Sequence, residues 1–266
     1  MKHLWAGFKI AFSMYSKIPV PKTEWSRENM RYSICFFPLV GLASGILCLL
    51  WLFLKPYIFA DGSGDIFSAA VLLLIPVLVT GGIHLDGFLD TTDALSSYME
   101  REKRLEILKD PRAGAFAIIY GIVYFLFYFG IYTVLEPGRG GMHIRFWTVI
   151  ALSFVLSRAL SGLAIVTFKM AKNTGLAASF ADAAQKKTVR IVMLFYAAAT
   201  AGVMIWVQPL AGALSCGAAA LVFRGYRAMA YRKFGGITGD LAGFFLQCCE
   251  LAGAFAVMAA RLILIS

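Results

Sequence analysis

Three aspartates, Asp86, Asp90 and Asp93, stand close together in a chain in which 60% of the residues are apolar. Their offsets of four and seven residues place them on one face of a helix. Carboxylates this close repel one another unless a cation lies between them. A hard divalent metal with oxygen ligands, which also binds substrate phosphates, would relieve that repulsion. The alternative interpretation is a polar helix start that leaves a membrane with its acids solvated.

Other polar residues could bind anions or complete such a site. Asp110 and Arg112 fall on a proline-marked bend shortly after the aspartates, where a capped helix and a turn is the plain alternative. Arg158 lies within apolar sequence, so its guanidinium either pairs with an acid or clamps a phosphate. Lys172 and Asn173, in a small polar loop, are further candidates for phosphate contacts.

A glycine-rich turn, GGITGD at 235–240, opens the last apolar stretch. It combines a permissive backbone with the hydroxyl of Thr238 and the carboxylate of Asp240. Such a turn at the start of a helix presents amide groups to an anion, and an acid beside it can complete a metal site. Taken alone, the motif is equally consistent with an ordinary turn.

The elements that must position these residues are membrane-spanning helices, because crossing the hydrocarbon core takes about 20 apolar residues. Neither a linker nor a long repeat divides the chain, so residues 1–266 are expected to form one domain. The expected fold class is all-α, a polytopic integral membrane helical bundle, with an N-terminal interfacial helix at 4–15. About seven stretches qualify as transmembrane helices: 35–55, 66–82, 115–135, 145–168, 189–207, 209–223 and 244–265.

The basic residues predict how the bundle is oriented. Twenty of the 25 Lys and Arg residues lie in the N-terminal segment or in loops that this topology places on one side. Basic loops mark the cytoplasmic side, so the N-terminus and the aspartate stretch are expected there. The same topology accounts for the net charge of +10, so a nucleic-acid partner is not indicated. The loops expected to carry the site are 80–114, 169–188 and 231–243.

Several other kinds of site and signal are not indicated. The five cysteines lack metal-ligand spacing and are interpreted as reduced residues, most of them in apolar spans. The sequence contains neither a phosphate-binding Walker loop nor a serine nucleophile motif. A cleavable signal peptide is not expected, because Lys9 interrupts the first apolar run and Pro19 ends it.

Together these features resemble the cobalamin synthase family, the adenosylcobinamide-GDP ribazoletransferases, over almost the whole chain. The order and spacing of the motifs carry the resemblance more than any single one. Ala94 stands where many relatives have glycine, and Pro111 where many have serine, which affects fine geometry rather than the chemistry. The motifs are FSMYSKIPVP (12–21), FFPLVG (36–41), GGIHLDGFLDTTDALSS (81–97), EILKDPRAGAFA (106–117), Ser157-Arg158, AKNTGL (171–176), GGITGD (235–240) and Glu250.

The resemblance implies a multi-pass enzyme of the bacterial inner membrane whose active site faces the cytoplasm. In this family α-ribazole, or its 5′-phosphate, attacks adenosylcobinamide-GDP, giving adenosylcobalamin or its phosphate and GMP, with Mg²⁺ as cofactor. Splitting a pyrophosphate between two large anions needs metal and cationic groups more than covalent catalysis. The implied partners are the two substrates and the lipid bilayer, and a second copy or other enzymes of the pathway are further candidates.

The resemblance also suggests residue roles. Asp86, Asp90 and Asp93 are expected to hold one or two Mg²⁺, with Asp110 or Asp240 completing the shell. His84 either assists deprotonation of the ribazole hydroxyl or merely hydrogen-bonds a neighbour. The candidate substrate contacts are Arg112, Arg158, Lys172, Asn173 and Thr238.

Two other functions remain as alternatives. A membrane CDP-alcohol phosphotransferase also holds metal on helical aspartates, but its usual Ala-Arg pair is replaced here by Phe88-Leu89. An ion-coupled transporter would place its acids near the middle of the membrane, on broken helices in repeated halves. The acids here gather at the cytoplasmic ends of the expected spans and the sequence shows no repeat, which favours an enzyme.

Overall fold

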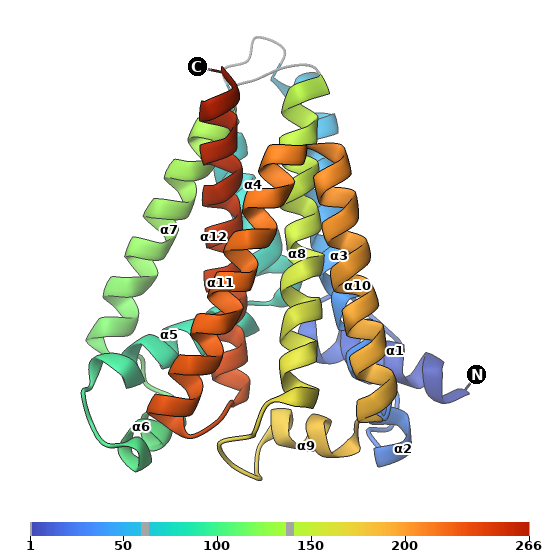
Figure 1. Ribbon diagram of the computed structural model, residues 1–266, viewed down its shortest axis with the longest axis vertical. Coiled ribbons are helices and arrows are strands. Elements are labelled where there is room, and N and C mark those ends of the chain that lie inside the picture. The colour runs from blue at the N-terminus through green and yellow to red at the C-terminus, as the bar shows by residue number, and fades with distance from the viewer. Residues whose placement is uncertain (1, 60–63, 137–140, 266) are drawn as a thin grey trace.

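The computed structural model describes residues 2–59, 64–136 and 141–265, and it confirms the all-α prediction (Figure 1). A short 3₁₀ turn, Ser33–Phe36, precedes the first long helix. The helices are α1 Lys2–Tyr15, α2 Arg27–Met30, α3 Phe37–Ile58, α4 Asp65–Thr80, α5 Ile83–Ser96, α6 Arg101–Ile107, α7 Ala115–Leu135, α8 Gly141–Thr167, α9 Leu176–Ala183, α10 Lys186–Val207, α11 Pro209–Phe234 and α12 Gly239–Ile265.

The long helices form one bundle with α8 and α12 at its centre (Figure 1). The most apolar windows of α8 and α12 are 78% and 67% buried, whereas that of α10 is 22% buried and leaves its outer face for lipid. Gly41 and Gly45 of α3 lie directly against α8, and a Cβ at Gly45 would come 2.6 Å from the carbonyl oxygen of Ala151. Small residues let membrane helices approach this closely.

The number of spans is lower than the seven expected. Among the described residues, five helices are long and apolar enough to cross a membrane, α3, α7, α8, α10 and α12, and a sixth span results if the bent pair α4 and α5 counts as one. The stretch expected at 209–223 is helical, within the 26-residue α11, but is not apolar enough to qualify. Arg224 and Arg227, together with many small residues, explain the difference.

A sharp break separates α4 from α5. The two helices meet at 94° across Gly81 and Gly82, whose φ angles of 63° and 81° suit glycine. The backbone amide of Lys17, after α1, donates to the carbonyl of Val79 and ties the N-terminal segment to this break. As a result α5 turns across the bundle instead of continuing along it, and carries its aspartates with it (Figure 1).

The short helices α1, α2, α6 and α9 gather at one end of the bundle, opposite the C-terminus (Figure 1). The helix expected at 4–15 is present as α1, which buries Ile10, Ala11 and Phe12 while Trp5 stays 57% exposed. That pattern suits the interfacial position predicted for it. The segments predicted to carry the site therefore lie at the same end as α1.

Candidate functional site

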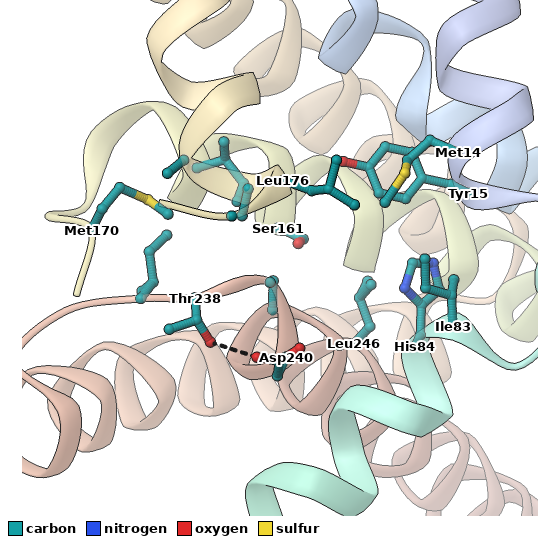
Figure 2. A pocket seen from close by; sticks show the side chains of 18 of the residues that line it. Met14, Tyr15, Ile83, His84, Ser161, Met170, Leu176, Thr238, Asp240 and Leu246 are labelled. Carbon is teal, nitrogen blue, oxygen red and sulfur yellow. Dashed lines mark hydrogen bonds between the residues drawn. The ribbon is translucent and has the colours of Figure 1, made fainter. Parts of the chain in front are cut away.

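A cavity of about 490 Å³ opens at this end between α1, α5, α8, α9 and α12 (Figure 2). Segments from the beginning, middle and end of the chain line it, so it exists only in the folded bundle. Five of the residues predicted from sequence are among its walls: His84, Asp86, Lys172, Thr238 and Asp240. Three separate sequence motifs thus meet at one place.

The cavity wall depends on a close crossing of α5 and α12. A Cβ added at Gly87 would come 2.7 Å from the backbone oxygen of Asp240, and one at Gly243 would come 2.8 Å from that of His84. The two backbones therefore touch, and any side chain at either glycine would force them apart. This crossing brings the first turn of α12 beside the aspartates of α5.

The carboxylates at the crossing act on one another. Asp90, which is half-buried, lies within electrostatic range of Asp86, Asp93 and Asp240. Asp240 also lies within electrostatic range of Asp86 and of the ammonium group of Lys172. The helical spacing predicted for the aspartates is confirmed, and of the three only Asp86 lines the cavity.

Asp93 has a different environment from the other two aspartates. Its Oδ2 accepts a hydrogen bond of 2.5 Å from the amide of Gly114, and its Oδ1 accepts one of 2.8 Å from Ala117. Both carboxylate oxygens thus cap the N-terminus of α7, where the helix dipole favours negative charge. A Cβ at Gly114 would come 2.5 Å from the carboxylate, so the glycine permits this contact.

Asp110 and Arg112 lie outside the cavity wall. They form a bidentate salt bridge on the exposed turn after α6, in which Nε and Nη2 of Arg112 donate to Oδ1 and Oδ2 of Asp110 at 2.9 and 2.8 Å. The guanidinium of Arg112 lowers the pKa of Asp110 to about 2. Asn173 is also exposed and does not line the cavity, although its neighbour Lys172 does.

Two loops are joined to hold Lys172 and Thr238 at the cavity. The backbone amide of Ala171 donates a hydrogen bond to the carbonyl oxygen of Ile237, and the amide of Ile237 donates one to the carbonyl oxygen of Lys169, both at 2.9 Å. The Nζ of Lys172 donates to the carbonyl of Leu105 at 2.7 Å, and burial lowers its pKa, as does the charge of Lys109. The Thr238 hydroxyl accepts from the amide of Leu241 and caps the start of α12.

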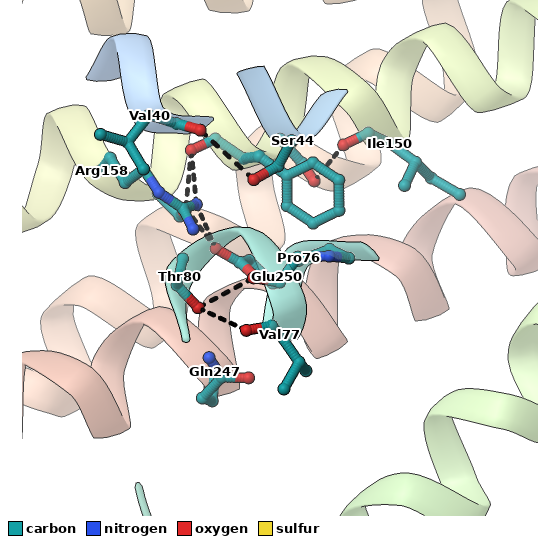
Figure 3. Close-up of polar contacts among 12 residues, drawn as sticks. Val40, Ser44, Pro76, Val77, Thr80, Ile150, Arg158, Gln247 and Glu250 are labelled. Carbon is teal, nitrogen blue, oxygen red and sulfur yellow. Dashed lines mark hydrogen bonds and ion pairs between the residues drawn. The ribbon is translucent and has the colours of Figure 1, made fainter. Parts of the chain in front are cut away.

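Arg158 does not line the cavity, and Figure 3 shows its guanidinium beside Glu250. Its Nη1 is 2.6 Å from Oε1 of Glu250 and also donates to the carbonyl of Phe154 at 2.9 Å. The hydroxyl of Ser157 donates to the same oxygen of Glu250 at 2.9 Å. Both charged side chains are almost fully buried, with exposures of 1% and 2%. Of the two sequence interpretations, this geometry favours the one in which Arg158 pairs with an acid.

The donor set at the crossing suits a hard cation. Among the described residues no three His, Cys, Asp or Glu side chains already converge as metal ligands. Mg²⁺ is usually bound through one or two carboxylates and substrate phosphates, rather than by a closed protein cage. Asp86 and Asp240 on the cavity wall, with Asp90 beside them, match that requirement.

Sequence reasoning missed several residues of the site. Tyr15 and Phe37 line the cavity beside His84, and Ser161 of α8 closes another side. Tyr15 belongs to one of the recognised motifs, so its position there was the available signal. Gly87 also belongs to a recognised motif, but its contact with Asp240 could not be predicted from the motif, because the two residues are more than 150 positions apart.

Comparison with known proteins identifies the family. The family model described as "Cobalamin-5-phosphate synthase" matches residues 7–259. The chain belongs to this family. Its resemblance to the cobalamin-5-phosphate synthase family extends over the entire site described above.

Individual relatives agree with that assignment. A protein of Lachnoclostridium phytofermentans described as adenosylcobinamide-GDP ribazoletransferase is 50% identical over 256 residues, covering 96% of this chain and 94% of the relative. A protein with the same description from Clostridium botulinum (strain Alaska E43) is 30% identical, and the match covers 96% of this chain and 98% of the relative. Another, from a Geobacillus species, is 32% identical, and the match covers 94% of each chain. No solved structure matches the chain.

Proposed function

We propose that this chain is a membrane-embedded transferase that joins α-ribazole, or its 5′-phosphate, to adenosylcobinamide-GDP and releases GMP in the last steps of cobalamin synthesis. Membership of the cobalamin-5-phosphate synthase family supports the reaction. The observation that carries the proposal is the joint presence of Asp86, Asp240 and Lys172 on one cavity wall, brought together from three distant segments.

The reaction exchanges one phosphorus–oxygen bond for another. A ribose hydroxyl of the ribazole forms a bond to the phosphorus on the cobinamide side, and the bond to the bridging oxygen breaks. GMP leaves with that oxygen, and the hydroxyl proton is released at the polar end of the cavity. A reaction of this type depends on positioning and on stabilising charge rather than on a covalent enzyme intermediate.

The residues around the cavity suit these tasks. Lys172, with its ammonium group at the wall, would contact the pyrophosphate, as would the amides at the start of α12 beside Thr238. Asp86, Asp90 and Asp240 would hold Mg²⁺ together with the donor's phosphates. The metal, when bound, would neutralise charge that builds on the departing GMP.

For the remaining candidates we propose more limited roles. Asp93, with both oxygens engaged by α7, would hold α5 in place rather than bind metal directly. Asp110, Arg112 and Asn173 would reach substrate only at the outer edge of the site, since none lines the cavity. Arg158 would stabilise the bundle through Glu250.

We further propose that the whole chain is one catalytic domain with this site facing the cytoplasm. The excess of Lys and Arg in the loops at the cavity end supports this orientation. The runner-up, a CDP-alcohol phosphotransferase, is disfavoured by the family match over residues 7–259.

The proposal is tested with the full chain purified into liposomes. With adenosylcobinamide-GDP, α-ribazole and Mg²⁺, we expect GMP and a cobalamin to form in equal amounts, and neither to form when one substrate is left out. CDP-alcohol substrates should give no CMP release. Release of CMP, or no product from folded protein, would overturn the proposal.

The α5–α12 crossing yields a further prediction. Gly87→Val should reduce the rate of GMP release by on the order of 100-fold, because the new side chain pushes α5 and its aspartates away from α12. Gly130→Val on α7 is the matched control, since a Cβ there meets nothing within 4 Å. If both variants keep wild-type rates, the crossing does not position the site.

A further inference from the structure

The cavity has two chemically different ends. Asp86, Lys109, Lys172 and Asp240 give one end its charge. Aromatic and aliphatic side chains from α1, α3, α5 and α12 form the other, which we call the aromatic end: Met14, Tyr15, Phe37, His84 and Leu246. Figure 2 shows Tyr15, His84 and Leu246 together on one side of the cavity, with Thr238 on the other.

The rings of the aromatic end form a compact cluster. The Tyr15 and Phe37 ring centroids are 4.3 Å apart, and those of His84 lie 6.1 Å from Tyr15 and 5.6 Å from Phe37. Tyr15 and His84 are nearly parallel, with an interplanar angle of 26°. Flat, apolar walls of this kind suit a planar heterocycle, which gains from stacking and from leaving water.

The packing of the aromatic end does not explain the buried ring nitrogen of His84. Its side chain is 5% exposed, and its Nε2 atom has no hydrogen-bond partner. A buried polar atom without a partner is costly and calls for an explanation. Because His84 lines the cavity, a ligand in the aromatic end would provide the missing partner.

The size of the cavity restricts the occupant. A volume of about 490 Å³ lies within the usual range for small-molecule sites. A nucleoside fits such a volume, whereas a corrinoid with its side chains is several times larger and must stay at the mouth. The smaller of the two substrates is therefore the one that enters.

We propose that the aromatic end binds the base of the acceptor nucleoside, with the His84 Nε2–H donating to a ring nitrogen of that base. This inference rests on the function proposed above and adds the orientation of the acceptor. With its base at His84 and Tyr15, the ribose extends toward Asp86 and Asp240, where the donor's pyrophosphate is bound. In this arrangement His84 recognises substrate and does not take the proton of the attacking hydroxyl.

The test is a steady-state comparison of His84→Phe and His84→Gln in liposomes. We expect His84→Phe to raise the KM for α-ribazole about tenfold, because a planar ring remains but its hydrogen bond is lost. The KM for adenosylcobinamide-GDP and kcat should stay near wild-type values. His84→Gln, whose amide can reach the Nε2 position, should recover much of the lost affinity.

His143→Gln is the matched control, because His143 lies on α8 18 residues before Ser161, a distance of about 27 Å along the helix. A fall in kcat with unchanged KM for α-ribazole would overturn the proposal and make His84 a proton acceptor. Unchanged kinetics in both His84 variants would also overturn it. A folded wild-type protein without activity would, by contrast, contradict the proposed function itself.

A second variant keeps the test independent of His84. Leu246→Phe places a larger side chain in the aromatic end and so leaves less space there for a base. We expect it to shift preference toward ribosides whose base lacks methyl substituents, measured as the ratio of kcat/KM values. An unchanged ratio in a folded variant would place the base elsewhere.

Discussion

Replacing Asp86 with asparagine should lower Mg²⁺-dependent GMP release by roughly 100-fold or more. Asparagine has nearly the same shape but no negative charge, so it binds a hard cation much less well. Asp86 is exposed on the cavity wall and lies in the first turn of α5. The variant should therefore fold normally, with an unchanged unfolding temperature.

The control for this variant is Asp182→Asn on α9. Asp182 forms an exposed pair with Arg27 at 3.2 Å and lies outside the cavity wall. Exposed pairs contribute little to stability, so both the rate and the fold should be retained. Full activity in the Asp86 variant would refute a role for this carboxylate in metal binding.

Removing one partner of the Arg158–Glu250 pair should have the largest effect on stability. Arg158→Met leaves the carboxylate of Glu250 buried without its counter-ion, and such a loss typically costs about 3–5 kcal/mol. The measurement is the fraction of protein that remains monodisperse in detergent on heating, compared with wild type. Ser157 alone cannot compensate, because one hydroxyl donor does not replace a guanidinium.

The double variant Arg158→Met/Glu250→Leu separates the two interpretations of Arg158. Replacing both members of a buried pair with apolar residues is often neutral or even stabilising. If Arg158 acts only on the fold, the double variant should regain stability and most of its activity. A stable double variant without activity would instead assign Arg158 to substrate binding.

The helices of this structure depend mainly on local sequence patterns, and most of them were predicted correctly. The offsets of Asp86, Asp90 and Asp93 correctly indicated one helix, and apolar stretches located most of the long helices. The break at Gly81 and Gly82 was hidden, because apolarity continues up to it and only the backbone changes direction. A hydropathy pattern measures burial in lipid and carries no information about such a turn.

The assignments that needed tertiary contacts were harder to make. Asp93 shares a helix face with Asp86, yet it caps α7, and that depends on how closely Gly114 approaches. The partner of Arg158 lies 92 residues away, so sequence could only pose the choice between an ion pair and a phosphate contact. Side chains that share a pattern thus acquire different roles through their neighbours.

The most direct test of the central claim is to measure divalent cation binding at the α5–α12 crossing. Mn²⁺ in place of Mg²⁺ can be followed by the loss of its free-ion electron paramagnetic resonance signal, with the full chain in liposomes. We predict that adenosylcobinamide-GDP tightens Mn²⁺ binding at least about tenfold, because the donor's phosphates complete the shell. Asp86→Asn should abolish that gain. Equal Mn²⁺ affinity in wild type and variant, with and without the donor, would contradict a metal site formed by these carboxylates.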